Sequence, residues 1–265
     1  MEGRGIASSK IALPDIIVQN QPLEKPLIYF FPFPNFGIGI HQFLCRNIEC
    51  SGLIMEVIME KYKVGIIGAT GMVGQRFVTL MENHPWFQLT ALAASSRSAG
   101  KTYQEAVSGR WAMKHPIPEE AKSLEVMDAQ ADGDKIAGMV DFVFCAVDMK
   151  KEEIKALEER YAKAECPVVS NNSANRWTDD VPMVVPELNA QHIEIIPAQR
   201  KRLGTRRGFI AVKSNCSIQS YTPLLTPLMR AGYEVESVLA CTYQAISGAG
   251  KTFERWPEMV DNLIP

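Results

Sequence analysis

The sequence lacks several features that would place it in a particular functional class. Its six cysteines contain no Cys-x-x-Cys pair and show no metal-ligand spacing with the four histidines, so no metal site is predicted. A formal charge of -2 shows no large excess of one sign, which argues against nucleic acid or an anionic membrane as partner. The composition is that of a soluble globular protein, and the cysteine usage favours a reducing, cytoplasmic setting.

An unbroken hydrophobic run of membrane-spanning length is also missing. Residues 26–45 carry no formal charge and are rich in Phe and Ile, but prolines and glycines interrupt them. The start of the chain shows no convincing secretory signal with a basic start, an apolar core and a cleavage site. We interpret residues 1–58 as a leader, disordered or not native to the folded unit, and expect no membrane partner. A targeting or membrane role is the alternative.

The first informative motif is a glycine-rich stretch between a predicted strand and a predicted helix. Residues 63–67 are a compact apolar run, and residues 75–82 continue with apolar side chains at helical spacing. Between them, Gly68-Ala69-Thr70-Gly71-Met72-Val73-Gly74 allows a tight turn and the close approach of a phosphate to a helix N-terminus. We predict a dinucleotide-binding loop; a glycine turn without a ligand is the alternative.

The acidic residue that holds the ribose of NAD is absent after the second predicted strand. That strand, at 88–94, leads instead into Ser95-Ser96-Arg97-Ser98. Hydroxyls and a guanidinium suit a 2′-phosphate through charge-assisted hydrogen bonds, so NADP is the predicted cofactor. A solvated loop is the alternative interpretation.

Strands and helices continue to alternate along the chain. Apolar runs at 141–147, 167–169 and 209–212 predict three more strands, and 150–164 predicts an amphipathic helix. The segment 101–134 has a loop-like pattern. This alternation predicts an α/β protein with a Rossmann-type doubly wound parallel sheet.

A polar turn, residues 170–176, follows the strand predicted at 167–169. Ligands of doubly wound sheets bind at the carboxyl ends of the strands, so Ser170, Asn171 and Ser173 could face the cofactor. Arg176 could hold an anion there. An Asx-rich turn with Arg176 in solvent is the alternative.

Cys216 lies between the strand at 209–212 and a helix whose apolar spacing covers 220–229. The unpaired N–H groups and the dipole of a helix N-terminus favour an anion, so we expect a readily formed thiolate. Asn215 offers an amide donor for charge developing on a substrate oxygen. Pro227 is expected to kink the helix or to shift its start. A small buried cysteine, the interpretation we adopt for Cys145 and Cys241, is the alternative for Cys216.

A nucleotide triphosphatase is a rival hypothesis from a different class. A β-rich run at 234–243 predicts a strand, and residues 245–252 after it fit a relaxed phosphate-loop pattern that ends in Gly-Lys-Thr. The first glycine of that pattern is absent, and the remaining residues leave no room for a strand that ends in a magnesium-binding Asp. We therefore disfavour this hypothesis.

The order of these motifs resembles aspartate-semialdehyde dehydrogenase, and in particular the branch shared by archaeal, fungal and some bacterial enzymes. The resemblance rests on the glycine loop, the Ser-Asn turn, Ser-Asn-Cys-Ser and Gln-Ala-Ile-Ser-Gly-Ala-Gly at 244–250, and it runs from about Lys61 to the end. It implies NADP-dependent and phosphate-dependent interconversion of L-aspartate 4-semialdehyde and L-4-aspartyl phosphate. That reaction lies on the route to lysine (through diaminopimelate), methionine and threonine.

The resemblance also implies roles for individual residues. Cys216 would be the nucleophile that forms a hemithioacetal and a thioester, and Asn215 matches the residue before it. Gln244 would orient the substrate, and Arg176 would bind phosphate or the acyl phosphate. The implied cofactor-binding positions are Gly68, Thr70, Gly71, Met72, Val73, Ser95, Ser96, Arg97, Ser98, Ser170, Asn171, Ser173, Gly248 and Ala249.

Related reductases are the nearest alternatives within this resemblance. N-acetyl-glutamyl-phosphate reductase typically has its cysteine in an Asn-Pro-Gly-Cys setting, unlike residues 214–217 here. Malonyl-CoA or succinyl-CoA reductases can share the nucleophile and the glycine loop, so only the acyl-group pocket would separate them.

A division into domains follows from the resemblance. Residues 1–58 have no family counterpart, 59–213 would be the NADP-binding Rossmann domain, and 214–265 would begin an α+β catalytic and dimerisation domain. The family's general-base histidine is expected after Pro265, and no histidine follows Cys216. We therefore expect a chain truncated at its C-terminus and inactive by itself, whereas the complete enzyme would be a homo-oligomer.

Overall fold

The computed structural model describes residues 60–245 of the 265-residue chain. The leader predicted at 1–58, the cofactor positions Gly248 and Ala249, and all but the first residue of the phosphate-loop pattern at 245–252 lie outside the described residues. No helix within 60–245 is long and apolar enough to cross a membrane.

Seven strands form one sheet in the described part of the chain. Each neighbouring pair is parallel, and the spatial order is β3-β2-β1-β4-β5-β7-β6. The strands are β1 (Tyr62–Ile67), β2 (Phe87–Ala94), β3 (Val126–Asp128), β4 (Phe142–Cys145), β5 (Val168–Ser170), β6 (Met183–Val184) and β7 (Ile210–Lys213). Because the order reverses between β1 and β4, the sheet is doubly wound with its switch point beside β1. The predicted α/β, Rossmann-type fold is confirmed.

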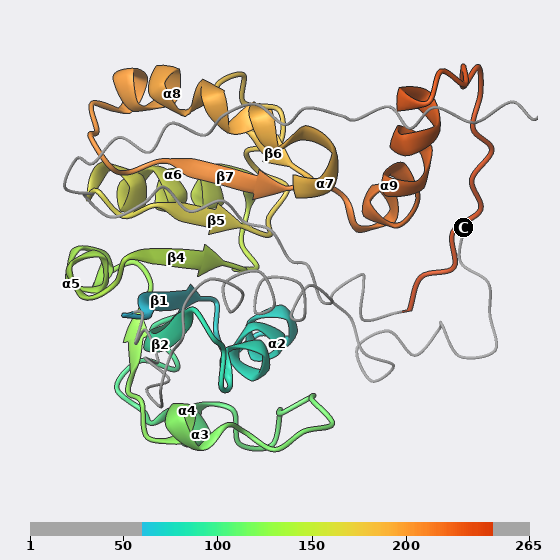
Figure 1. Cartoon of the computed structure of the whole chain (residues 1–265). Coiled ribbons are helices and arrows are strands. Elements are labelled where there is room, and N and C mark those ends of the chain that lie inside the picture. Colours follow the sequence, from blue (N-terminus) through green and yellow to red (C-terminus); the bar gives the residue numbers. More distant parts are fainter. Residues whose placement is uncertain (1–59, 246–265) are drawn as a thin grey trace, which may run out of the picture.

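Helices cover both faces of this sheet. They are α2 (Met72–Met81), α3 (Tyr103–Ala106), α4 (Glu119–Lys122), α5 (Gly133–Met139), α6 (Lys151–Lys163), α7 (Pro186–Asn189), the 3₁₀ helix η1 (Ala190–Ile195), α8 (Ile196–Leu203) and α9 (Cys216–Arg230). One hydrophobic cluster joins the sheet to α2, α3 and α4, and a second joins it to α5, α6 and α8. The sheet and these helices therefore form three layers in the described part of the chain, with the sheet in the middle (Figure 1).

Alternation along the strands explains the two clusters. In β4, Phe142 and Phe144 belong to the cluster with α2, whereas Val143 and Cys145 belong to the cluster with α6. Successive side chains of a strand point to opposite faces, so four consecutive apolar residues cover both faces at once. Full burial of one such phenylalanine contributes about 1.5–3 kcal/mol.

The predicted strands agree with the structure where apolar residues follow one another along the chain. The predictions at 63–67, 88–94, 167–169 and 209–212 differ from β1, β2, β5 and β7 by at most one residue at each end. The segment 101–134 is not a loop, because it contains α3, α4, β3 and the start of α5. The helices α3 and α4 and the strand β3 are short and include charged or polar residues, so no apolar run marks them in the sequence.

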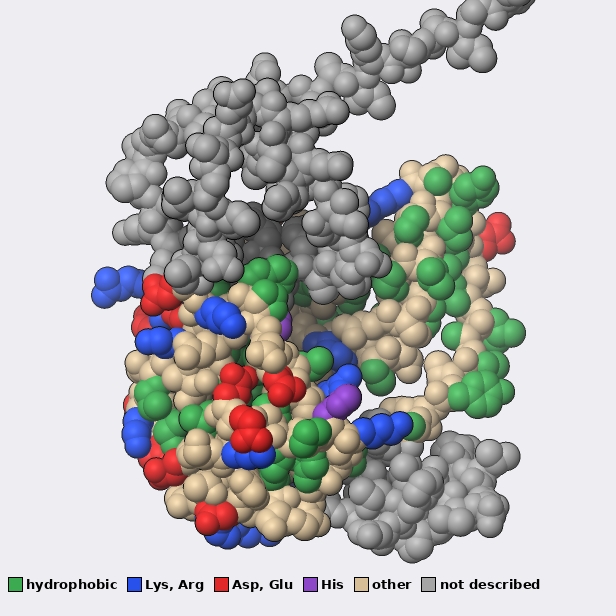
Figure 2. Space-filling model, turned by 60° about the horizontal axis from the view of Figure 1, so that its bottom comes forward, with side chains coloured by type: hydrophobic (Ala, Val, Ile, Leu, Met, Phe, Trp, Pro, Cys, Tyr) green, Lys and Arg blue, Asp and Glu red, His purple; other side chains and the backbone are tan. Residues whose placement is uncertain are grey.

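Helix α9 stands apart from the sheet, at the right of Figure 1. It begins at Cys216 and continues through Pro227, so that proline does not shift its start. None of its residues is buried, and hydrophobic side chains such as Leu224 and Met229 are exposed. Figure 2 shows these hydrophobic side chains gathered on the right, over α9 and the segment after it.

The strand predicted at 234–243 is absent. These residues have no regular secondary structure and are almost all exposed. A β-rich run forms a strand only against a hydrogen-bonding neighbour, and none of the seven described strands pairs with it. The prediction of a strand from sequence propensity alone is therefore wrong for these residues.

Candidate functional site

Four groups of predicted site residues lie at one edge of the sheet, each after the carboxyl end of a strand. The glycine loop follows β1, Ser95–Ser98 follow β2, the turn 170–176 follows β5, and Cys216 follows β7. The arrows of β4, β5 and β7 in Figure 1 point to this same side. Because all the paired strands are parallel, this edge is where a doubly wound sheet binds its ligand.

Two glycines of the loop after β1 cannot be replaced without moving the backbone. Gly68 has a φ of 87°, and a Cβ atom there would lie 2.4 Å from the carbonyl oxygen of Ala146. A Cβ atom on Gly74 would lie 2.1 Å from the carbonyl oxygen of Gly68. The glycines therefore bring β1, the residues after β4 and helix α2 into backbone contact at the switch point.

The N-terminus of α2 offers backbone donors to an anion. Gly71 is the exposed N-cap residue and supplies no side-chain hydrogen bond to the first turn, which Met72 and Val73 begin. In an α-helix the first N–H groups lack intrahelical acceptors, and the dipole favours negative charge beside them. This loop fits the pyrophosphate of a dinucleotide. The predicted contacts of Gly68, Thr70, Gly71, Met72 and Val73 with the cofactor remain predictions.

Two buried polar side chains that we did not predict hold this loop. The Gln75 amide donates to the carbonyl oxygens of Thr70 (3.1 Å) and Arg110 (3.0 Å) and accepts from the N–H of Ala112 (2.8 Å). The Tyr103 hydroxyl donates to the carbonyl oxygen of Ala69 at 2.9 Å, and burial raises the pKa of Tyr103. Gln75 lies on the buried side of α2 with Val78 and Met81, so a polar residue at an apolar position was the available signal.

The Ser95–Ser98 segment is exposed except at its last residue. Ser95, Ser96 and Arg97 are exposed, whereas the buried Ser98 hydroxyl accepts a hydrogen bond from Arg110 Nη2 at 2.9 Å. A second guanidinium, which we did not predict, therefore lies beside this segment. Two arginines and two exposed hydroxyls fit a phosphate better than a neutral ribose hydroxyl.

The turn 170–176 presents fewer side chains than we expected. Ser170 is buried, and its hydroxyl donates to Glu158 of α6, so it does not face the sheet edge. Ser173 is exposed, and Asn171 is half-buried with its N–H bonded to the Cys145 carbonyl oxygen at 2.8 Å. An amphipathic helix is expected to keep its charges away from its apolar side, but Glu158 of α6 is buried on that side, where side chains of the turn donate to it.

Arg176 connects this turn to the Cys216 segment. Its Nε donates to the carbonyl oxygen of Lys213 at 3.0 Å, and the side chain is half-buried. It also lines a cleft together with Trp177, Met183 and His192. The alternative prediction, a turn with Arg176 in solvent, is not supported, because Nε donates to the backbone of β7, the strand beside β5 in the sheet.

Cys216 is the first residue of α9 and an exposed free thiol. Asn215 is the N-cap residue, and its side-chain oxygen accepts from the N–H of Ser217 at 2.8 Å. This hydrogen bond fixes the side-chain oxygen of Asn215, and the side-chain nitrogen can donate to another acceptor. The alternative of a buried structural cysteine is therefore wrong for Cys216.

The other described cysteines differ in their surroundings. Cys145 and Cys166 are buried, and burial raises the pKa of both thiols, that of Cys166 to about 12. Cys241, predicted as a core residue, is exposed in the segment after α9 where the expected strand is absent. Gln244 lies in the same exposed segment, so the structure does not bring it against the sheet edge.

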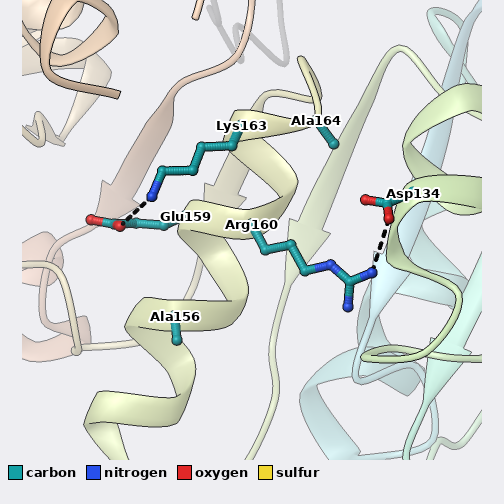
Figure 3. Close-up of a pocket in the computed structure, with 6 residues that line it drawn as sticks. All are labelled: Asp134, Ala156, Glu159, Arg160, Lys163 and Ala164. Carbon is teal, nitrogen blue, oxygen red and sulfur yellow. Dashed lines mark hydrogen bonds and ion pairs between the residues drawn. The ribbon is translucent and has the colours of Figure 1, made fainter. Parts of the chain in front are cut away.

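A groove between α5 and α6 is the other hollow of note, but it holds none of the predicted site residues. Figure 3 shows its charged side chains paired with one another: Arg160 with Asp134 at 3.0 Å and Lys163 with Glu159 at 3.4 Å. Paired surface charges are usual for a solvated helix face, and we assign no function to this groove.

The fold and the loop after β1 define the class: a dinucleotide-binding Rossmann domain. The family described as "Semialdehyde dehydrogenase, NAD binding domain" matches residues 63–196. This chain belongs to that family.

Relatives and solved structures agree with this assignment. The aspartate-semialdehyde dehydrogenase of Methanothermobacter thermautotrophicus is 40% identical over 204 residues, which are 76% of this chain and 55% of the relative. That of Aspergillus fumigatus is 39% identical over 205 residues, 77% of this chain and 54% of the relative. The Candida albicans aspartate semialdehyde dehydrogenase crystallised with NADP is 36% identical with a TM-score of 0.57, covering 65% of this chain and 48% of that one. The chain spans about half the length of the curated relatives it matches.

Proposed function

We propose that this chain is the cofactor-binding part of an aspartate-semialdehyde dehydrogenase and supplies the nucleophile of that enzyme. The observation that carries the proposal is the exposed Cys216 thiol at the start of α9, on the sheet edge that also holds the uncapped N-terminus of α2. A nucleophile and a pyrophosphate site at one edge suit a dehydrogenase that works through a covalent intermediate. The 40% identity to an enzyme of that name indicates which dehydrogenase.

The cofactor we propose is NADP. The α2 N-terminus would hold its pyrophosphate, and Ser95, Ser96 and Arg97 would hold its 2′-phosphate with Arg110 nearby. When bound, the cofactor donates or accepts a hydride at the substrate carbon. Asn171 and Ser173, at the carboxyl end of β5, are proposed to line the same edge.

In the biosynthetic direction the Cys216 sulfur attacks the acyl carbon of L-4-aspartyl phosphate. A C–S bond forms, the C–O bond to phosphate breaks, and inorganic phosphate leaves beside Arg176. The Asn215 amide donates to the carbonyl oxygen as negative charge develops on it. After the thioester carbon has gained a hydride, the hemithioacetal collapses, the C–S bond breaks and L-aspartate 4-semialdehyde is released. Gln244 is proposed to orient the substrate.

The wider role of the protein follows from this reaction. We propose a place in lysine, methionine and threonine biosynthesis, in the cytoplasm, and a homo-oligomer for the complete enzyme. Residues 59–213 would be the cofactor domain and 214–265 the beginning of the catalytic domain. The separation of α9 from the two hydrophobic clusters of the sheet supports that boundary.

The alkylation rates of individual cysteines test the proposed nucleophile. Cys216 and Cys241 are both exposed, which makes Cys241 a matched control within the chain. We expect iodoacetamide to modify Cys216 at least ten times faster, because negative charge on its sulfur is stabilised by the α9 N-terminus. Aspartate semialdehyde should slow only the Cys216 reaction. Equal rates for the two cysteines, measured by peptide mass spectrometry, would overturn the proposal.

A further inference from the structure

The carboxyl group of Glu158 is buried beneath the turn 170–176, with 1% of the residue exposed. One of its oxygens accepts from the Ser170 hydroxyl and from Asn172 Nδ2 at 3.3 Å, and the other accepts from Asn175 Nδ2 at 2.7 Å. None of the ion pairs found within residues 60–245 includes Glu158. Three neutral donors from one turn therefore satisfy a buried acidic group, and such an arrangement is costly to break.

The Asn175 amide is held at both of its ends. While its nitrogen donates to Glu158, its oxygen accepts from the Thr178 hydroxyl at 3.0 Å. Its side chain is therefore fixed in one orientation, and Asn175 itself is 2% exposed. Arg176 is the next residue along the chain.

Arg176 is in turn tied to the segment that leads to Cys216. Its guanidinium donates to the carbonyl oxygen of Lys213, three residues before the thiol. A continuous series of contacts thus runs from Glu158 on α6 through Asn175 and Arg176 to the end of β7. Among the described contacts, the Asn175–Glu158 hydrogen bond joins α6 to the residue directly before Arg176.

We propose that Glu158 is a positioning residue: by holding Asn175, it sets where the Arg176 guanidinium lies relative to Cys216. The inference rests on the proposed function, in which Arg176 binds phosphate beside the nucleophile. Anchoring of the neighbouring Asn175 by a buried side chain fixes where the anion-binding arginine begins, while only its Nε is used on the Lys213 carbonyl oxygen. Asn171 has a separate anchor on the Cys145 carbonyl oxygen, so the cofactor edge depends less on Glu158.

The hydrogen-bond pattern allows a paired exchange as the test. The variant Asn175→Asp places a second carboxylate against Glu158, where a donor is required. Adding Glu158→Gln restores a donor between the two side chains: the new amide nitrogen can donate to the new carboxylate, which still accepts from Thr178. The new amide oxygen still accepts from Ser170 and Asn172. Glu159→Gln, the adjacent and more exposed position, controls for loss of charge.

The measurement uses the full chain and the rate at which iodoacetamide modifies Cys216, titrated with inorganic phosphate. Phosphate held by Arg176 should slow this reaction, and Arg176→Gln should abolish the effect. We expect Asn175→Asp to raise the half-maximal phosphate concentration at least tenfold. The double variant should return it to within threefold of the parent, and Glu159→Gln should leave it unchanged. All rates are taken well below each variant's melting temperature.

The outcomes separate the inference from the proposed function. If Arg176→Gln abolishes the phosphate effect but Asn175→Asp does not weaken it, Glu158 has only a structural role and the inference is wrong. Failure of the double variant to restore the phosphate midpoint, with its melting temperature restored, contradicts it as well. If phosphate has no effect on the parent chain, the proposed role of Arg176 fails and the inference fails with it.

Discussion

The two halves of the candidate site differ in how firmly the chain holds them. The glycine loop is surrounded by backbone, and the buried side chains of Gln75 and Tyr103 bond to its carbonyl groups. The Cys216 segment is exposed, and α9 contributes no buried residue. Its ties to the rest of the described chain include the Arg176–Lys213 bond and a bond from Arg230 to the Leu188 carbonyl oxygen.

This difference indicates which contacts position the cofactor site and which position the nucleophile. The cofactor edge depends on contacts that residues 60–213 make among themselves, so it should form and bind independently of α9. The nucleophile depends on a helix cap and a few hydrogen bonds, so its placement should respond to small changes. Substitutions in the glycine loop should therefore lower the stability of the whole domain, whereas substitutions at the start of α9 should affect that helix alone.

The largest effect is expected from Gly74→Ala. The new Cβ atom would meet the Gly68 carbonyl oxygen at 2.1 Å, so α2 must move away from β1. We expect a loss of about 3 kcal/mol in the free energy of unfolding, measured with urea, and loss of NADP binding. Gly138→Ala in α5 is the control, since nothing lies within 4 Å of the added atom. A stable Gly74→Ala protein that binds NADP would show that the glycine loop does not need this close backbone contact.

Gln75→Ala should have the next largest effect. It leaves the Thr70 and Arg110 carbonyl groups and the Ala112 N–H without their partner. We expect about 2 kcal/mol lower stability and at least tenfold weaker NADP binding by calorimetry. Gln104→Ala, at an exposed glutamine, should change stability by less than about 0.5 kcal/mol. Unchanged binding in Gln75→Ala would show that the loop does not need this amide.

Removal of the cap on α9 should act locally. Asn215→Ala eliminates the acceptor of the Ser217 N–H and should cost the helix about 1 kcal/mol. Hydrogen exchange of α9 amides should accelerate about fivefold while exchange in β1 and β4 stays constant. Asn215→Asp keeps the acceptor and should keep the parent rates. Acceleration across the sheet would mean that the two halves are not independent.

Acidification should produce the smallest effect, through Glu165, which follows α6 and lies outside both halves of the candidate site. Glu165 accepts from the backbone N–H groups of Arg206, Gly208 and Arg207, which lowers its pKa below the usual 4.5. A depressed pKa adds stability above about pH 5 that is lost as the pH falls through the folded-state value. In urea unfolding between pH 3 and 6, Glu165→Gln should show a flatter dependence than the parent. Identical slopes would contradict this assignment.

Sequence patterns were sufficient for the parts of the fold that continuous apolar runs mark. The apolar run at β1 and the glycines after it predicted the strand and the loop, whereas the switch point beside β1 is known only from the structure. The short elements between Lys101 and Asp134 were missed because their pairing, as of β3 with β2, is set by tertiary contacts. The β-rich run at 234–243 shows the opposite error, since propensity without a partner produced no strand.

The site was predictable in outline but not in its supports. Cys216 and the glycine loop follow from local patterns, and the structure places both at the carboxyl edge. Arg110 and Glu158 act through partners 12 to 17 residues away, which no local pattern specifies. Their signal was weak: Glu158 is a charged residue four positions after Ile154, on the buried side of α6. Ser170 was misjudged because its hydroxyl is used by that buried glutamate.

A thermal-shift titration of the chain with NADP, NAD and ATP in parallel tests whether this sheet edge is an NADP site. A ligand that binds only the folded state stabilises it by about 2.7 kcal/mol at a hundredfold excess over its dissociation constant. We predict the largest rise in melting temperature with NADP, a smaller rise with NAD and none with ATP. A rise with ATP alone, or no rise with either dinucleotide, would contradict the assignment of this sheet edge as an NADP site.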